Sequence, residues 1–188
     1  MSTKIDDAEI HKIVQRVLQQ ALGSPAPDNP TSQSVPSGKK VVAIGADHGG
    51  FELKEALKPE LSVLGFEVKD VGTNSKEAVD YPDFAHAVAQ LVSTGKAWRG
   101  IMIDGAGIGS CIVANKVPGV RAGMAYDISS ASNGREHNDT NVLTLGAGMI
   151  GANLAKQIVK TWLTTEFGGD RHTKRINKII SVEKQYLK

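Results

Sequence analysis

The sequence has very little cysteine, no long apolar run and no concentration of charge of one sign. Its single cysteine, Cys111, cannot form a disulfide within the chain, which is typical of a protein from a reducing compartment. No stretch reaches the roughly 18 apolar residues of a membrane span, and no basic segment followed by an apolar one marks a secretory signal. We therefore expect a soluble protein that is not secreted and that resides in the cytoplasm.

The charges are nearly balanced: 22 lysines and arginines face 20 aspartates and glutamates, which leaves a formal net charge of +2. Because no long basic run stands out, the electrostatic footprint of a nucleic-acid-binding protein is absent. A small-molecule ligand is the better expectation. With 188 residues, the chain is long enough for one domain with a substantial core and too short for two ordinary domains.

Residues 24–38 are rich in proline, serine, asparagine and threonine, a composition that favours a semi-rigid linker between residues 1–23 and a main domain of residues 39–188. Ahead of the linker, Asp6 and Glu9 suit a capping box, and Gly23 suits a helix end. One apolar stripe recurs there at helical spacing: Ile10, Ile13, Val14, Val17, Leu18, Ala21 and Leu22. The pattern predicts an amphipathic helix.

An isolated helix of about 17 residues is only marginally stable in water, so this stripe needs a partner. The partner is either the chain's own main domain or another molecule. Asp6, Asp7 and Glu9 contradict the acid-poor pattern of a mitochondrial presequence. The helix and linker together resemble the encapsulation peptides of bacterial microcompartment cargo. This resemblance implies that residues 5–22 bind a shell protein and that the protein lies inside a microcompartment.

From Lys39 onward, short apolar runs alternate with helical stretches, which is typical of parallel strands buried on both faces. We expect a five-stranded doubly wound sheet, a Rossmann-like three-layer α/β sandwich, with strand order 2-1-3-4-5. Pro59 is expected to kink or divide the first helical stretch. The expected strands are Val41–Gly45, Glu67–Val71, Gly100–Asp104, Val120–Ala125 and Val142–Leu145.

Polar residues follow several of these strands, where ligands bind in such folds. The first strand runs into Asp47 and His48, and the third into Asp104 and a loop in which every second residue is glycine. Such glycines allow backbone amides to converge on a negative oxygen. Near the C-terminus, Arg171 and Arg175 lie one helical turn apart, a spacing that suits a bidentate grip on a phosphate.

Each of these features has a plainer interpretation. Aspartate is a preferred helix-capping residue, so Asp47 can simply cap the helix that follows it. His48, and His137 further along the chain, can be ordinary surface or core histidines. The two arginines can form a solvated helix face, and Cys111 can be a small buried residue. The glycine loop is not a dinucleotide fingerprint, because its spacing differs and it follows the third strand.

Taken together, six segments resemble the family of type B ribose-5-phosphate isomerases and galactose-6-phosphate isomerases. The resemblance spans about residues 40 to 185, and the most specific segments are 47–51 (DHGGF) and 137–141 (HNDTN). The others are Asp80-Tyr81-Pro82, the loop 105–109, Ala114-Asn115-Lys116, and Gly169-Asp170-Arg171-His172 with Arg175.

The resemblance implies reversible conversion of ribose 5-phosphate to ribulose 5-phosphate through a cis-enediolate, with no metal and no organic cofactor. It implies that His137 opens the sugar ring with help from Asp47, and that Asn138 orients substrate hydroxyls. It also implies a homodimer or a tetramer of dimers, since family sites draw residues from two subunits. The remaining substrate-binding residues would be His48, Arg171 and Arg175 on the phosphate, Tyr81, and the amides of Gly105, Gly107 and Gly109 on the enediolate.

The chain departs from the family pattern at the base. Many members have cysteine where this chain has Asp104, and another branch has glutamate where it has Ser110. We expect Asp104 to abstract the proton, with Cys111 as the second candidate. Ala106 also replaces a usual hydroxyl residue, and Gly148 an arginine found in several members.

These departures keep other functions open. One is isomerisation of a four- or six-carbon sugar phosphate. Another is a non-catalytic role in binding sugar phosphates or in assembly. A metal-dependent hydride-shift isomerase has no evident cluster of carboxylate and histidine ligands in the sequence.

Overall fold

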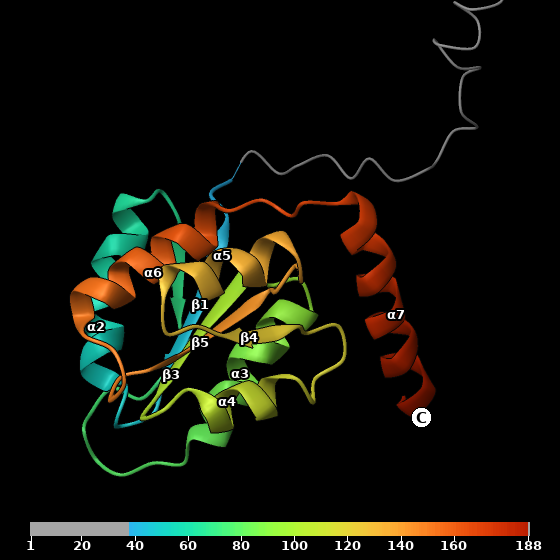
Figure 1. Ribbon diagram of the computed structural model, residues 1–188. Coiled ribbons are helices and arrows are strands. Elements are labelled where there is room, and N and C mark those ends of the chain that lie inside the picture. The colour runs from blue at the N-terminus through green and yellow to red at the C-terminus, as the bar shows by residue number, and fades with distance from the viewer. Residues whose placement is uncertain (1–37, 188) are drawn as a thin grey trace, which may run out of the picture. The chain divides into compact units, whose positions relative to one another are not determined.

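The computed structural model describes residues 38–187, so the helix and linker expected before Gly38 lie outside the described residues. Its centre is a parallel sheet of five strands: β1 (Val41–Ala46), β2 (Glu67–Asp70), β3 (Arg99–Asp104), β4 (Ala122–Met124) and β5 (Val142–Gly146). Figure 1 shows helices on both sides of this sheet. The expected doubly wound α/β sandwich is confirmed.

The strand order is β2-β1-β3-β5-β4, so the predicted order 2-1-3-4-5 is wrong at its last two positions. The fifth strand, Val-Leu-Thr-Leu-Gly, is buried along its whole length and pairs with β3. The fourth strand has only three residues, Ala-Gly-Met, and all are partly exposed. A short, weakly apolar strand belongs at a sheet edge, whereas a continuous apolar strand belongs in the interior.

Two apolar clusters fill the two faces of the sheet. On one face, α2 (Phe51–Val63), α5 (Ile128–Glu136) and α6 (Ala152–Thr164) cover alternate side chains of β1, β3 and β5, including Ile44, Ile101 and Leu143. On the other face, α3 (Tyr81–Ser93) and α4 (Ile108–Ala114) cover Ala43, Met102 and Val142. This period-2 alternation of a strand's side chains creates the three layers.

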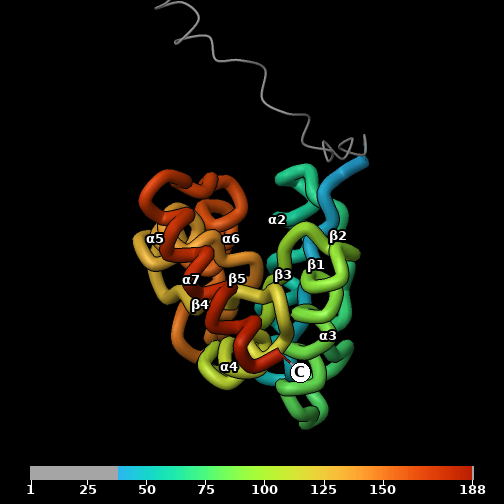
Figure 2. The backbone as a smooth tube through the Cα atoms, turned by 90° about the vertical axis from the view of Figure 1, so that its right-hand side faces the viewer, coloured from blue at the N-terminus to red at the C-terminus, as the bar shows by residue number. Residues whose placement is uncertain are grey.

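One helix departs from what the sequence indicates, and another packs only lightly on the domain. Helix α2 continues through Pro59 over 13 residues, so the expected division of this stretch does not occur. The last helix, α7 (Asp170–Tyr186), buries only His172 and Ile176. In Figure 1 it stands apart from the other helices, on the β4 side of the sheet. Figure 2 turns this side toward the viewer, with α7 in front.

None of the helices within residues 38–187 has the length and apolar character needed to cross a membrane.

Candidate active site

The loop that follows β3 is built around the carboxylate of Asp104. One oxygen, Oδ1, accepts hydrogen bonds from the amide of Ala106 at 2.8 Å and from the amide of Gly107. The other, Oδ2, accepts from the amide of Ser110 at 3.1 Å and from its hydroxyl. Asp104 is only 4% exposed. Its carboxylate therefore serves as the internal anchor of the loop.

Glycine is required at two places in this loop. Gly107, the N-cap of α4, has a φ of 81°, in the left-handed region that favours glycine. At Gly109, a Cβ atom would lie 2.5 Å from Cζ of Tyr81. The tyrosine ring therefore packs directly against the loop.

Several amides of this loop remain available to a ligand. Within residues 38–187, the amides of Gly105, Ile108 and Gly109 donate to no protein acceptor. Asp104 accepts from the amides of Ala106, Gly107 and Ser110 instead. The first hydrogen bond of helix α4 is donated by the amide of Cys111. Such amides at a helix N-terminus favour an anionic oxygen. The amides of Gly105 and Gly109 can therefore donate to the enediolate as predicted. The amide of Gly107 cannot, because it already donates to Asp104.

The residues after β1 lie beside this loop. Oδ1 of Asp47 accepts a hydrogen bond from the amide of Gly50 at 2.9 Å and so closes the turn before α2, whose N-cap is Gly50 itself. A Cβ atom at Gly49 would lie 3.4 Å from that oxygen and 3.6 Å from the nitrogen of Gly105. The exposed His48 contacts the backbone of Val79 through Nδ1. The ends of β1 and β3 and the start of α3 thus bring together Asp47, His48, Tyr81 and the glycine loop.

Cys111 lies one turn into α4. Its Sγ is 3.6 Å from the carbonyl oxygen of Ala122 and 3.6 Å from Nδ2 of Asn115, so it faces the edge strand β4. Burial raises the pKa of this thiol, and the charge of Asp104 adds to the rise. A half-buried thiol with a raised pKa is a poor source of thiolate.

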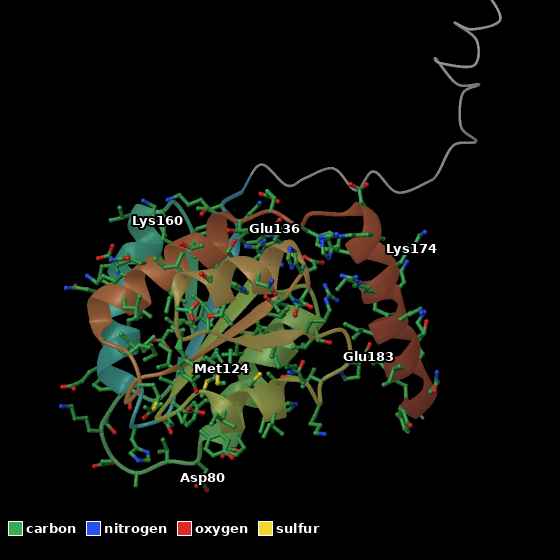
Figure 3. The ribbon with its side chains drawn as sticks, in the orientation of Figure 1. Asp80, Met124, Glu136, Lys160, Lys174 and Glu183 are labelled. Atoms are coloured by element: carbon green, nitrogen blue, oxygen red, sulfur yellow. The ribbon has the colours of Figure 1, made fainter. Side chains whose placement is uncertain are left out.

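The second group of predicted residues lies at the opposite ends of the strands, the N-terminal ends. His137 ends α5, and the chain then enters the N-terminal end of β5, whereas Asp47 and Asp104 mark the carboxyl ends of their strands. In Figure 3, Glu136 and Lys174 lie at the top and Asp80 at the bottom. A single chain therefore does not bring His137 to the glycine loop.

His137 is held by the start of α7. Its ring stacks on that of His172, with centroids 4.3 Å apart and planes 6° apart. His172 is almost fully buried and accepts a hydrogen bond at Nε2 from Nε of Arg171 at 3.3 Å. Burial lowers the pKa of His172, and the neighbouring His137, Arg171 and Arg175 lower it further. Asn138, Arg171 and Arg175 are exposed around this pair.

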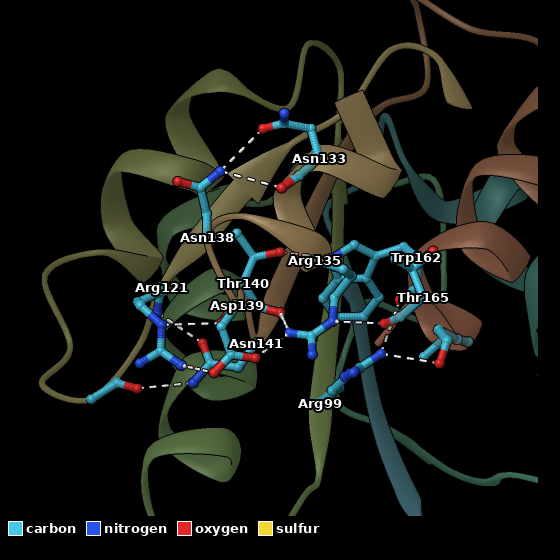
Figure 4. Close-up of polar contacts among 12 residues, drawn as sticks. Arg99, Arg121, Asn133, Arg135, Asn138, Asp139, Thr140, Asn141, Trp162 and Thr165 are labelled. Carbon is cyan, nitrogen blue, oxygen red and sulfur yellow. Dashed lines mark hydrogen bonds and ion pairs between the residues drawn. The ribbon is translucent and has the colours of Figure 1, made fainter. Parts of the chain in front are cut away.

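The segment after Asn138 is fixed by buried polar contacts, which Figure 4 shows in close-up. Asp139 has a φ of 44° and pairs with Arg121 and Arg135, each at 2.8 Å. Thr140 accepts a hydrogen bond from Nε1 of Trp162 at 2.8 Å. These contacts set the position of the preceding His137 and Asn138.

The sequence singled out Asp139 and Thr140 as part of the segment 137–141, but it assigned no supporting role to them or to their partners. The spacing of Arg135 and Asp139, four residues apart across a helix end, was a usable signal for an ion pair. Arg121 and Trp162 carried none, because they are brought to the segment by other elements. Nearby, Arg99 donates to the carbonyls at the end of α6, and burial lowers its pKa to about 10, with the charge of Arg135 acting in the same direction.

A groove of about 1120 Å³ separates α7 from the body of the domain. On its α7 side, the apolar residues Ile179, Val182, Tyr186 and Leu187 are about half exposed or more. On the other side it is lined by residues of the α4 to α5 region, among them Ala122, Met124 and Asn138. Within residues 38–187, no group of three or more histidine, cysteine, aspartate or glutamate side chains is arranged to hold a metal ion.

Comparison with known proteins identifies a family, related sequences and a related structure. A family model described as Ribose/Galactose Isomerase matches residues 42–179. The chain is 44% identical to ribose-5-phosphate isomerase B of Escherichia coli over 146 residues, which cover 78% of this chain and 98% of that protein. It is 41% identical to the D-erythrulose-4-phosphate isomerase of Pectobacterium atrosepticum, covering 77% of this chain and 95% of the relative.

Among solved structures, ribose-5-phosphate isomerase B of Clostridium thermocellum superposes with a TM-score of 0.77 at 48% identity. The match covers 78% of this chain and 99% of that one.

Proposed function

Because the chain belongs to the ribose/galactose isomerase family, we propose that it interconverts ribose 5-phosphate and ribulose 5-phosphate by proton transfer between C1 and C2. The observation that carries this proposal is the loop after β3. Its unused amides at Gly105, Ile108 and Gly109 lie beside the carboxylate of Asp47. Amides held in this way stabilise the negative oxygen of an enediolate without reorganising during the reaction.

The other residues take the roles that the family resemblance implies. His137 opens the sugar ring and Asn138 orients its hydroxyls. Arg171 and Arg175, one turn apart on α7, hold the phosphate together with His48. Tyr81, packed against Gly109, lines the site beside the loop. The reaction needs neither a metal nor an organic cofactor, since it consists of proton transfers alone.

A homodimer, or a tetramer of such dimers, unites these roles. Asp47 and the glycine loop lie at the carboxyl ends of the strands, whereas His137 lies at their N-terminal ends. A complete site therefore requires His137 of one subunit to meet the glycine loop of another. The groove beside α7, with its exposed Ile179, Val182 and Tyr186, provides an apolar surface for the second copy. Burial of these side chains would stabilise the dimer by the hydrophobic effect.

A second substrate class, four-carbon sugar phosphates, is favoured by one relative, and two small residues mark where the chain departs from the family pattern. Ala106 offers no hydroxyl, and Gly148 lies against the loop, where a Cβ atom would be 3.0 Å from the carbonyl oxygen of Gly105. A relative at 41% identity is named for D-erythrulose 4-phosphate. Six-carbon substrates are the remaining alternative.

The test is a comparison of kcat/KM for the purified protein on ribose 5-phosphate, D-erythrose 4-phosphate and D-allose 6-phosphate, with ketose formation followed directly. We expect the highest value for ribose 5-phosphate. A higher value for the tetrose would reassign the substrate. Binding without conversion of any of the three would leave a non-catalytic role in sugar-phosphate binding or assembly.

We place this reaction in the cytoplasm, inside a bacterial microcompartment. The support is the amphipathic pattern of residues 5–22 followed by the linker 24–38. Removal of residues 1–38 should leave kcat unchanged and abolish co-purification with shell proteins. A matched control replaces Val14 and Leu18 by aspartate, which removes the apolar stripe and keeps the length. Undiminished shell association in both variants would refute the targeting role.

A further inference from the structure

The hydrogen bonds of Asp104 argue against it as the base. A general base needs an oxygen that can reach the substrate proton. Both oxygens of Asp104 are already engaged, by two donors each, all from its own loop. Transfer of a proton to this carboxylate would disrupt the bonds that hold the loop. The thiol of Cys111 faces β4 and has a raised pKa, so it offers no better base.

Asp47 is the carboxylate beside the loop that has an oxygen to spare. Its Oδ1 accepts one bond, from Gly50, and its Oδ2 accepts none from residues 38–187. Oδ2 is also not among the fully buried unpartnered atoms of these residues, which are Thr144 Oγ1 and His172 Nδ1. It therefore keeps some exposure to solvent, although Asp47 as a whole is only 7% exposed.

The space next to Asp47 is kept open by glycine. At Gly49, a Cβ atom would lie within 4 Å of Oδ1 of Asp47 and of the free amide of Gly105. A substrate atom in that position lies next to the Asp47 carboxylate, whose Oδ1 accepts only one hydrogen bond, and next to an amide that can donate to a negative oxygen. These are the two groups that formation of an enediolate requires.

We propose that Asp47 is the base that moves the proton between C2 and C1, and that Asp104 is a positioning residue that fixes the amides of the loop. The proposal rests on the isomerase function proposed above. The Asp47 carboxylate takes the proton from C2, and the C2–H electron pair forms the C1=C2 double bond. The C1 carbonyl pair becomes an enediolate oxygen, held by the loop amides. The O2 proton then passes to O1, and the Asp47 carboxylic acid returns its proton to C1.

Two readouts separate this role from help in ring opening. D-Erythrose 4-phosphate has its C4 hydroxyl esterified, so it cannot close a furanose ring and needs no ring opening. Exchange of its C2 hydrogen with D2O, followed by NMR, reports the base step alone. The variants are Asp47→Asn, which keeps an acceptor for the Gly50 amide, Asp104→Asn, and His137→Ala as the ring-opening control.

For Asp47→Asn we expect at least a 100-fold loss of exchange on both ribose 5-phosphate and erythrose 4-phosphate, the size of a general-base contribution. For His137→Ala we expect a loss on ribose 5-phosphate alone. If Asp47→Asn retains wild-type exchange on the tetrose, Asp47 is not the base and the proposal falls. If the wild-type protein exchanges and converts no sugar phosphate, it is the proposed function that fails.

The anchoring role of Asp104 has a readout that does not depend on activity. Asp104→Asn should speed amide hydrogen exchange at Ala106, Gly107 and Ser110 at least tenfold, because two of the four accepted bonds are lost. It should lower kcat about tenfold with little change in KM. Ser110→Ala should act in the same direction. Unchanged loop protection in Asp104→Asn, together with complete loss of C2 exchange, would instead identify Asp104 as the base.

Discussion

Replacing Asp139 with asparagine tests whether the buried ion pairs hold the segment that carries His137. Arg135 has only 5% of its side chain exposed, and its Nη1 lies 2.8 Å from Oδ1 of Asp139. The second partner, Arg121, is 21% exposed and lies 2.8 Å from Oδ2. Asparagine has nearly the same shape and tolerates the left-handed φ of 44° at this position, so the change removes charge and little else.

The expected loss can be worked out from burial. Breaking a buried pair by removing one partner costs about 3–5 kcal/mol, because a charge is left uncompensated. Asp139 is 32% exposed, and Arg135 keeps its bond to the carbonyl of Thr140 at 2.5 Å, so the lower end applies. The exposed side of the cluster adds less than about 1 kcal/mol. We expect a loss of about 3 kcal/mol, or a fall in Tm of about 6–12 °C for a protein of this size.

Thermal and urea unfolding measure this loss. The control is Lys156→Gln, which breaks the more exposed ion pair with Glu60 and should cost less than about 1 kcal/mol. If Asp139→Asn is within 1 kcal/mol of the wild type, the two arginines do not depend on this carboxylate. The account of how His137 is positioned would then be refuted.

Three further predictions concern single residues. Gly50→Ala should destabilise the domain by about 2–3 kcal/mol in urea unfolding, because its Cβ would lie 2.4 Å from the carbonyl oxygen of Ile103. The control Gly151→Ala, where a Cβ atom meets no neighbour, should cost only a few tenths of a kcal/mol. Alkylation of Cys111 by iodoacetamide at pH 7.5 should be slower than that of a free thiol, since burial raises its pKa; an equal rate would contradict this. Burial lowers the pKa of His172 in the folded state below its ordinary value of 6.5, so the unfolded state binds the proton more readily. The contribution of this residue to the stability of the fold is therefore complete above pH 6.5 and is lost as the pH falls below it. Tm should drop less between pH 7.5 and 5.5 in His172→Gln than in the wild type.

The sequence was sufficient for the sheet and its helices but not for the strand order. Hydrophobic runs identify strands because parallel strands are buried on both faces. The order of the last two strands depends on which of them pairs with β3. The contrast between Ala-Gly-Met and Val-Leu-Thr-Leu-Gly carried that information, but only as a difference in length and apolar character.

The candidate site was predictable as a set of residues and not as an arrangement. Motifs name Asp47, Asp104 and His137, because each has the chemistry that the reaction needs. They do not show that Asp104 is surrounded by four donors, since these bonds depend on the backbone path of the loop. Nor do they show that His137 precedes a strand while Asp47 follows one, which places the two residues at opposite ends of the parallel strands.

That separation has a genetic consequence. In the proposed dimer, each site combines Asp47 of one chain with His137 of the other. Suppose that one chain carries Asp47→Asn and its partner carries His137→Ala. One of the two sites then contains both substitutions and the other contains neither. Two inactive alleles expressed in the same cell would therefore restore one working site in every mixed dimer, a case of complementation between subunits.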